Sequence, residues 1–596
     1  MTLRVVAFVT GVVAGATAGA ARQAVAPVGV IKGQVVDEAS GRPVPGAWVT
    51  LSGGTPPRRV VVGPGGLFEF GSLPAGAYGL QANRPGYLPT SAGQHSPTGS
   101  GQPVVISDGS KRADIVLPMW RTGSIAGSVM TTEGSPLTGV EVHALQRTLG
   151  GGSWQWTDAA VSMSDDHGHY HLSNLMPGDF LVAARPIQDP ETPLLMALLT
   201  ANSASAADVM AGVASSPGEM PVTDGRVPAS ATTYYATSPS VEASILALPP
   251  ATTRTGVDLR VRQGRGVRIS GVLAGATGPV GGLTVHLVTP IAKQVATDGP
   301  NIEVASAACA KDGRFGFSGV AAGQYSLVLT WTPLLPPAAV RAGSPGGPQT
   351  ALPLPTEPAL WARLPLSVAD ADITGVQLAL HQGSTVSGRV AFDGSGPPPV
   401  GLESANLRLE PVASPFMPSP PSPVPRLEID ASGRIQSVSI TPGRYLLRAT
   451  PPHGWTVVSA TTGDRDVLDD PLDIRADIVD LVLTLTDRPL GAIAGSAVRL
   501  DGQPAADATV VVFPADASQR HDTSPAARRL RAVRAEESGA FAVPNLPPGD
   551  YLALALDVDP PAGWQDPQRL QGWEKSATRV ALALGEVQKL NLEVIK

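Results

Sequence analysis

Short runs of alternating apolar and polar residues recur along the chain and predict β-strands. In Phe68-Glu69-Phe70, for example, every second side chain is expected on one face, as in a strand with one buried side. Glycine and proline, which turns require, bound these runs. The same order of about seven short strands and turns recurs five times. This pattern is typical of all-β sandwiches.

Two glycines ten positions apart mark each copy of the repeat. The first glycine predicts a tight hairpin turn, because a residue without Cβ accepts a positive φ. In the second, fourth and fifth copies the second glycine follows proline and the pair predicts a type II turn; in every copy the aromatic residue two positions after this glycine is expected in the core. The glycine pairs are Gly66/Gly76, Gly168/Gly178, Gly313/Gly323, Gly433/Gly443 and Gly539/Gly549, and the aromatics are Tyr78, Phe180, Tyr325, Tyr445 and Tyr551.

Two further signatures complete each copy. Upstream of the glycine pair, a single glycine interrupts a short apolar strand, and a longer apolar strand follows after a turn. Downstream, an alternating strand such as 114–117 or 590–594 closes the copy. The interrupting glycines are Gly33, Gly127, Gly271, Gly388 and Gly495.

The first copy carries the fullest set of these signatures. It combines Asp37 with the sequence GRPVPGA at 41–47 and LPAGAY at 73–78. This unit resembles the carboxypeptidase regulatory-like domain, a small prealbumin-like (transthyretin-like) β-sandwich within the carbohydrate-binding-like fold. The whole chain is similar to long secreted proteins of soil bacteria that string such domains together. The resemblance implies a fold more than an activity.

These signatures predict an all-β chain: a tandem array of five Ig-like or prealbumin-like β-sandwich domains after a signal peptide. Residues 1–20 are the expected signal peptide, with Arg4, an apolar core and small residues at the cleavage site, and an uncleaved membrane anchor is the alternative. A short helix is expected at 194–213. The predicted domains are 26–119, 122–264 with an inserted segment at 187–240, 265–381, 382–487 and 488–596.

The charge and hydropathy of the chain argue against nucleic-acid binding and against a membrane-spanning protein. The 596 residues carry a formal net charge of -7 and no basic stripe, which argues against nucleic acid as a partner. No later segment reaches the roughly 20 apolar residues of a membrane helix, so no membrane span is expected after signal cleavage. The single cysteine, Cys309, is expected as a small buried residue. The predicted location is secreted, periplasmic or cell-surface.

Catalytic signatures are missing from the sequence. A zinc carboxypeptidase site requires His and Glu three positions apart, and none of the nine histidines has Glu three positions on. No G-x-S-x-G elbow, P-loop or dinucleotide fingerprint is present. The chain is therefore predicted not to be an enzyme and to have no catalytic, cofactor-binding or metal-binding residues.

Residues 165–171, DDHGHYH, form the densest polar cluster. His167, His169 and His171 alternate, so on a strand they share one face and could ligate a metal. The preferred interpretation is a solvated strand face, because the corresponding residues of other copies lie on the outward side of the same hairpin. No metal site is predicted here.

Trp154 and Trp156 are the candidate ligand platform. They flank Gln155 on an expected strand, so both rings are predicted on one side, where paired indoles could stack on sugar rings. The alternative is that they cover the core or the inserted segment.

The sequence favours a secreted or surface-associated, non-catalytic multidomain binding protein with carbohydrate as its ligand. This argument rests on resemblance of fold and on the tryptophans. The alternatives are a structural or adhesive spacer that binds other proteins, and an accessory module of an extracellular peptidase or outer-membrane transport system. The expected partner is a polysaccharide or a cell-surface protein.

Overall fold

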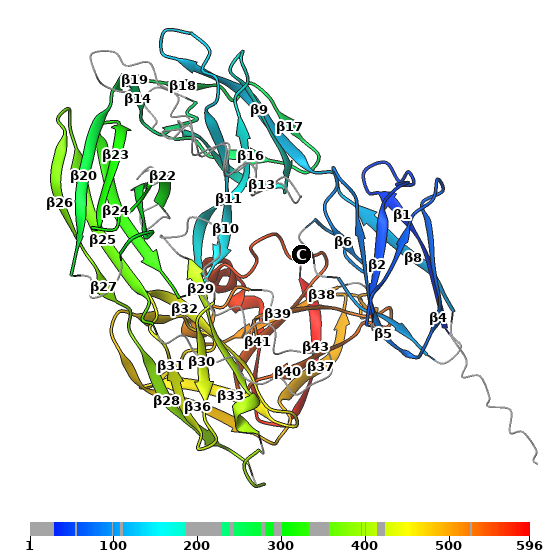
Figure 1. Cartoon of the computed structure of the whole chain (residues 1–596). Coiled ribbons are helices and arrows are strands. Elements are labelled where there is room, and N and C mark those ends of the chain that lie inside the picture. The colour runs from blue at the N-terminus through cyan, green and yellow to red at the C-terminus, as the bar shows by residue number, and fades with distance from the viewer. Residues whose placement is uncertain are drawn as a thin grey trace, which may run out of the picture. The chain divides into compact units, whose positions relative to one another are not determined.

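The computed structural model shows an all-β chain with several β-sheet domains (Figure 1). The predicted signal peptide, the helix predicted at 194–213 and most of the inserted segment lie outside the described residues. No helix among the described residues is long and apolar enough to cross a membrane. The structure describes residues 29–53, 56–97, 99, 101–107, 111–185, 228–237, 243–275, 280–290, 301–333, 357–394, 396–399, 401–413, 424–506, 508–524 and 527–595.

The chain divides into two compact units. The first unit comprises Met1–Gln94 and Ser100–Trp120, and the second comprises His95–Gly99 and Arg121–Lys596. The second unit contains the second to fifth copies of the repeat. The number of independent domains within it stays a prediction.

The first unit consists of two sheets packed around one core. One sheet has the order β4-β1-β8, and the other has the order β3-β2-β5-β6, with β7 also paired to β5. Phe68, Phe70 and Tyr78 are buried between the sheets. The strands are β1 (Gly29–Asp37), β2 (Trp48–Ser52), β3 (Arg58–Val61), β4 (Leu67–Leu73), β5 (Gly76–Asn83), β6 (Thr90–Ser91), β7 (Val104–Ile106) and β8 (Lys111–Met119).

The second copy repeats this two-sheet arrangement. One sheet has the order β11-β10-β13-β15 with β16 paired to β13, and the other has the order β12-β9-β17 with β18 paired to β9. β14 pairs with β19 outside these two sheets. The strands are β9 (Gly123–Thr131), β10 (Glu141–Gly150), β11 (Ser153–Met163), β12 (His169–Leu175), β13 (Gly178–Arg185), β14 (Pro228–Ser230), β15 (Thr233–Tyr234), β16 (Leu246–Leu248), β17 (Thr253–Arg254), β18 (Leu259–Val261) and β19 (Gln263–Arg265).

The third copy has one sheet of order β23-β20-β26 and one of order β22-β21-β24-β25-β27. Cys309 is buried between them as expected, and burial raises the pKa of its thiol. The strands are β20 (Val267–Ala274), β21 (Thr284–Pro290), β22 (Asn301–Ala308), β23 (Arg314–Val320), β24 (Gly323–Trp331), β25 (Leu360–Val368), β26 (Ile373–Ala379) and β27 (His381–Gln382).

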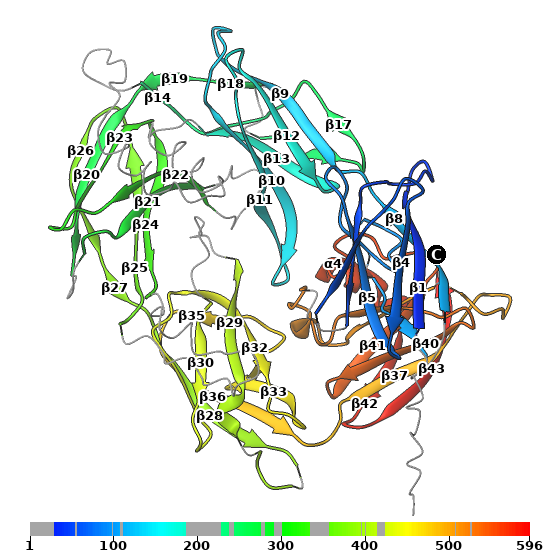
Figure 2. The same cartoon turned by 45° about the vertical axis from the view of Figure 1, so that its right-hand side comes forward.

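In the fourth copy one continuous sheet of order β34-β33-β36-β28-β31-β30-β29-β32-β35 surrounds the core. Figure 2 shows the yellow β29, β30, β32 and β35 close together, as this order requires. The elements are β28 (Val386–Phe392), the 3-10 helix η1 (Leu402–Ser404), β29 (Asn406–Ala413), β30 (Arg426–Ile429), β31 (Arg434–Ser437), β32 (Gly443–Thr450), β33 (Thr456–Thr462), β34 (Arg465–Asp466), β35 (Leu472–Ile474) and β36 (Ile478–Thr486).

The fifth copy has a sheet of order β39-β38-β41-β43-β37-β40, with β42 paired to β41. A short α-helix follows β41. The elements are β37 (Gly491–Val498), β38 (Thr509–Pro514), η2 (Ala517–Gln519), β39 (Arg531–Arg534), β40 (Ala540–Leu546), β41 (Gly549–Leu556), α4 (Pro567–Trp573), η3 (Glu574–Ser576), β42 (Thr578–Leu582) and β43 (Val587–Ile595).

The first marker glycine of every copy has the positive φ that the sequence predicts. The φ values lie between 74° and 80°, the left-handed region that favours glycine. The aromatic residue after the second glycine is buried in every copy, as expected. In the four copies where it is tyrosine, its hydroxyl donates to the carbonyl oxygen four residues earlier. The core role predicted for these aromatics is therefore confirmed.

The type II turn predicted at the second glycine is wrong. This glycine is the first residue of β5, β13, β24, β32 or β41. Of the three glycines that follow proline, Gly178 and Gly549 have φ of 153° and 148°, far from the value near +80° that a type II turn needs, and Gly443 has no positive φ. The left-handed residue lies instead six positions after the first glycine, at Ser72, Asn174, Gly319 and Asn545.

The interrupting glycines have a steric explanation. Each lies beside the closing segment of its copy, whose strand pairs in parallel with the first strand of that copy. A Cβ on Gly495 would lie 1.7 Å from the carbonyl oxygen of Leu590, and one on Gly388 would lie 1.8 Å from that of Leu481. Gly33, Gly127 and Gly271 show the same conflict at 2.2, 2.1 and 2.5 Å.

Candidate functional site

The predicted tryptophan platform lies on β11, which forms a long hairpin with β10. Trp156 pairs with Arg147 and Trp154 pairs with Leu149 across the two strands. Trp156 is only 5% exposed and packs with Leu181 and Ile302. Its ring therefore offers no surface for stacking, and it takes the core role that was the alternative.

Trp154 is 39% exposed and is held in place from two sides. Its indole Nε1 donates to Oδ2 of Asp566, 2.8 Å away, and the Arg147 guanidinium lies 4.7 Å from the ring centroid. Asp566 is also the N-cap of α4, where Oδ1 accepts from the backbone N–H of Gln568. The structure therefore offers a single partly exposed indole, that of Trp154, which Asp566 and Arg147 hold in place, rather than two side-by-side rings.

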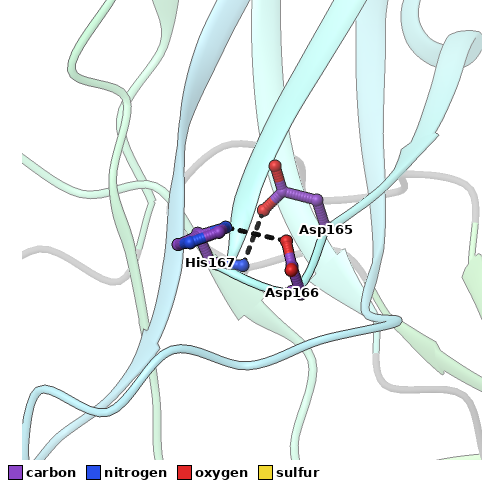
Figure 3. Close-up of side chains that lie close together, drawn as sticks. All are labelled: Asp165, Asp166 and His167. Atoms are coloured by element: carbon purple, nitrogen blue, oxygen red, sulfur yellow. Dashed lines mark hydrogen bonds and ion pairs between the residues drawn. The ribbon is translucent and has the colours of Figure 1, made fainter.

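Asp165, Asp166 and His167 lie together in the exposed turn before β12 (Figure 3). Their potential ligand atoms are within 4.8 Å of one another. The Asp165 carboxylate already accepts the backbone N–H groups of His167 and His169, at 2.9 and 2.7 Å. These bonds, the one from His169 first, lower the pKa of Asp165 below its usual range.

The same carboxylate turn occurs in other copies, which indicates a structural role. In the fourth copy, Asp430 accepts the backbone N–H groups of Ser432 and Arg434 at 2.9 Å each. In the third, a carboxylate two positions later in the turn has a related role: Asp312 accepts the backbone N–H of Arg314 at 3.2 Å. Asp165 therefore terminates a hairpin turn that recurs without the histidines, in agreement with the preferred interpretation of a solvated strand face.

A buried ionic network between the fourth and fifth copies was not foreseen from the sequence. The Asp469 carboxylate, 2% exposed, accepts from Nη2 of Arg528 and Nε of Arg529, each at 2.7 Å. Arg529 also donates to the Tyr551 hydroxyl at 2.9 Å. Burial alone would raise the pKa of Asp469, but the two arginines outweigh it and the pKa is lowered.

A second ionic contact reinforces the first. Arg448 of β32 donates to Asp522 at 2.6 Å and to the Ser524 hydroxyl at 2.7 Å. Both partners belong to the segment between η2 and β39, which carries Arg528 and Arg529 as well. The available sequence signal is the pair of charged dipeptides, 469–470 and 528–529, in a chain with only 16% charged residues.

A further cluster of titratable side chains lies on β10 and β11. His143 is buried, with Nδ1 2.9 Å from Asp158 and Nε2 3.3 Å from Glu141. Burial lowers the pKa of His143, but the hydrogen bonds to Asp158 and Glu141 outweigh it and the pKa is raised. The bond with His143, together with Arg185, holds the pKa of Glu141 at about 2. The two ring nitrogens face opposite ways, so these groups do not converge on a metal position.

Several bacterial proteins of known structure, two of them pilins, are similar to the chain. A minor pilin of Streptococcus agalactiae matches with 13% identity, 39% of this chain and 96% of the other covered, and a TM-score of 0.20. The shaft pilin SpaA from Lactobacillus rhamnosus GG matches with 11% identity, 40% and 98% covered, and a TM-score of 0.19. The Bacillus anthracis TIE protein matches with 9% identity, 80% and 74% covered, and a TM-score of 0.14. At these scores no functional conclusion follows.

The amino-acid sequence of the first unit matches the sequence model of one protein family. No curated protein matches the chain. The family match falls within the first unit, on the strands β1 to β8 and the motif around Asp37 that carry the resemblance. Residues 30–117 match the sequence model of the carboxypeptidase regulatory-like domain, so the match covers the first copy of the repeat.

Proposed function

We propose that this protein is a secreted or surface-associated, non-catalytic binding protein with carbohydrate as its ligand. The observation that carries the proposal is the partly exposed Trp154 indole at the end of the β10–β11 hairpin. Its hydrogen bond to Asp566 fixes the ring, so little side-chain entropy is lost when a sugar packs against it. The carbohydrate-binding-like fold that the first copy resembles supports the same ligand class.

A glycan and polysaccharide binding screen on the purified full chain, read by tryptophan fluorescence, tests this function. We expect a ligand whose binding quenches fluorescence and is weakened about tenfold in Trp154→Ala, the order of one lost stacking contact. Trp361→Ala is the matched control, because it removes another partly exposed indole, on β25. Equal binding by the wild type and Trp154→Ala would contradict the assignment.

The non-catalytic part of the proposal has its own test. Peptide, ester and glycoside substrates are incubated with the purified protein, with and without added zinc and with a chelator. We expect no turnover above the uncatalysed rate in any condition. Metal-dependent hydrolysis that co-purifies with the protein would contradict it.

A structural spacer is the second candidate, and the buried network around Asp469 favours it. Charges that are paired and desolvated between the fourth and fifth copies resist bending at that junction, because separating them leaves charges without partners. Small-angle X-ray scattering of the wild type and Asp469→Asn tests this role. We expect a larger radius of gyration in the variant, and an unchanged one would argue against a rigid junction.

A further inference from the structure

The outer face of one sheet in the first unit carries a second set of groups suited to ligand binding. In β2, Val49 and Leu51 point into the core, so Trp48 and Thr50 lie on the opposite face, partly exposed. Trp48 is therefore not a core residue. Figure 1 shows β2 with β5 and β6 among the blue strands of this unit.

The strand register gathers polar side chains around Trp48. β3 pairs on one side, placing Val61 opposite Trp48 and Arg59 opposite Thr50. β5 pairs on the other side, placing Asn83 opposite Trp48 and Gln81 opposite Thr50. An indole, an arginine and two amides therefore share one flat face, which we call the Trp48 face.

Arg59 is the residue on this face that lacks a partner for its charge. Its guanidinium lies 4.4 Å from the Trp48 ring centroid, and neither side chain makes a hydrogen bond or ion pair with the described residues. The neighbouring Arg58 instead donates to the Gly71 carbonyl oxygen, and Lys32, on the other sheet, pairs with Glu69. The indole holds the guanidinium in place while its donors remain available.

Among the acidic residues of the first unit whose side chains the structure describes, none neutralises this charge. Asp37 is buried and accepts from Ser40 and Tyr87, Glu38 follows it in the turn after β1, and Glu69 lies on the other sheet. The Trp48 face is therefore complementary to an anion.

The shape of the face indicates what kind of anion it binds. Small ligands bind tightly in concave sites, whereas a flat sheet face suits an extended chain that makes repeated contacts. Gln81 and Asn83 supply amide donors and acceptors for hydroxyl groups beside the cation. Arginine bonds a planar carboxylate through two parallel N–H donors.

We propose that the Trp48 face binds an acidic polysaccharide, with a uronate carboxylate on Arg59 and sugar hydroxyls on Gln81 and Asn83. Trp48 acts as a positioning residue that orients the guanidinium. The inference rests on the proposed carbohydrate-binding function but uses a site on a different unit from Trp154, so the two can fail separately.

Affinity electrophoresis and calorimetry of the full chain with polygalacturonate test the proposal. We expect binding that weakens about tenfold or more in Arg59→Gln, the loss typical of a charge-assisted contact. Trp48→Leu is expected to weaken it less, because the guanidinium remains but is less well oriented. Arg42→Gln is the matched control, since it removes an exposed arginine of the same unit without touching this sheet face. Thermal unfolding of each variant establishes that it is folded.

Further probes identify the chemistry. Fully methyl-esterified polygalacturonate should not bind through Arg59, because the carboxylate charge is gone, and dextran sulfate should bind no more tightly than polygalacturonate. An equal loss of binding in Arg42→Gln and Arg59→Gln, or tighter binding of dextran sulfate than of polygalacturonate, would indicate non-specific attraction between opposite charges. Either result would overturn the proposal. Binding of neutral glycans through Trp154, with none of polygalacturonate, would overturn this inference and leave the proposed function intact. No binding of any glycan would remove both.

Discussion

Replacing Gly33 by alanine tests the steric explanation of the repeat most directly. Gly33 lies on β1, between β4 and β8 in the same sheet. A Cβ built there would lie 2.2 Å from the carbonyl oxygen of Ile115 and 2.6 Å from Cζ of Phe68. Carbon and oxygen atoms normally approach no closer than about 3.3 Å, so the methyl group is about 1 Å short of the space it needs.

That missing space has to come from the backbone. The Ile115 carbonyl belongs to β8, which pairs in parallel with β1, so relief of the clash separates the two strands. Phe68 is buried and cannot swing away. Overpacking of a well-packed core costs about 1–3 kcal/mol, and this clash is with backbone, so we expect about 3 kcal/mol or more.

Gly71 provides the matched control in the neighbouring strand β4. A Cβ at Gly71 meets no atom of the described residues within 4 Å, and the φ of Gly71 is not positive. Gly71→Ala should therefore leave the stability nearly unchanged or raise it slightly, since alanine reduces the entropy of the unfolded chain.

Calorimetry of the full chain measures both variants. The first unit is compact by itself, so its unfolding should give its own transition. A loss of about 3 kcal/mol lowers the melting temperature of a domain of this size by on the order of 10 °C or more. Equal melting temperatures for Gly33→Ala and Gly71→Ala would refute the steric reasoning.

Three further predictions follow from other sites. Asn545→Ala should destabilise the fifth copy by about 1 kcal/mol, because Asn545 has φ of 60°, whereas Asn545→Gly should not; urea midpoints measure both. Asp469→Asn should cost about 3–5 kcal/mol, because it leaves the buried Arg529 without its counter-ion, whereas the partly exposed Arg528 keeps Asp466 at 3.6 Å. Because the pKa of Asp469 is lowered in the folded state, its contribution to folding stability is present above its ordinary pKa of about 3.9 and is lost as pH falls through the folded pKa. Measuring the free energy of unfolding at decreasing pH detects this loss. The raised pKa of His143 gives the opposite pH dependence. The contribution of His143 to folding stability is full below about pH 6.5 and is lost as pH rises through its folded pKa, and this dependence should vanish in His143→Gln.

The local features of the fold were predictable because they repeat at fixed spacing. Positive φ at Gly66 and its counterparts follows from the turn that must close a hairpin, and the burial of Tyr78 follows from strand alternation. The left-handed residues at Ser72 and Asn545 were missed, because serine rarely adopts that conformation and asparagine, which adopts it more readily, is also common elsewhere. They lie where the register shifts against the opening strand, in a bulge that depends on the partner strand rather than on local sequence.

The candidate sites were less predictable for the same reason. Alternation correctly places Trp154 and Trp156 on one side of β11, but it cannot say what covers that side, and Trp156 is covered by residues of β13 and β22. The partners of Asp469 lie about 60 positions away along the chain, and no pattern within a single sequence links them.

The closing strand and the interrupting glycine of each copy depend on one another. β8, β26, β36 and β43 each run parallel to the first strand of their own copy, which fixes where the chain enters and leaves that copy. Parallel first and last strands place the entry and the exit at opposite ends, which is the connectivity that a string of domains requires. The interrupting glycine permits that pairing, because any side chain there would strike the closing strand's carbonyl oxygen. The same glycine therefore governs both the closure of each copy and the direction in which the chain leaves it, and this explains why it occurs once in every copy.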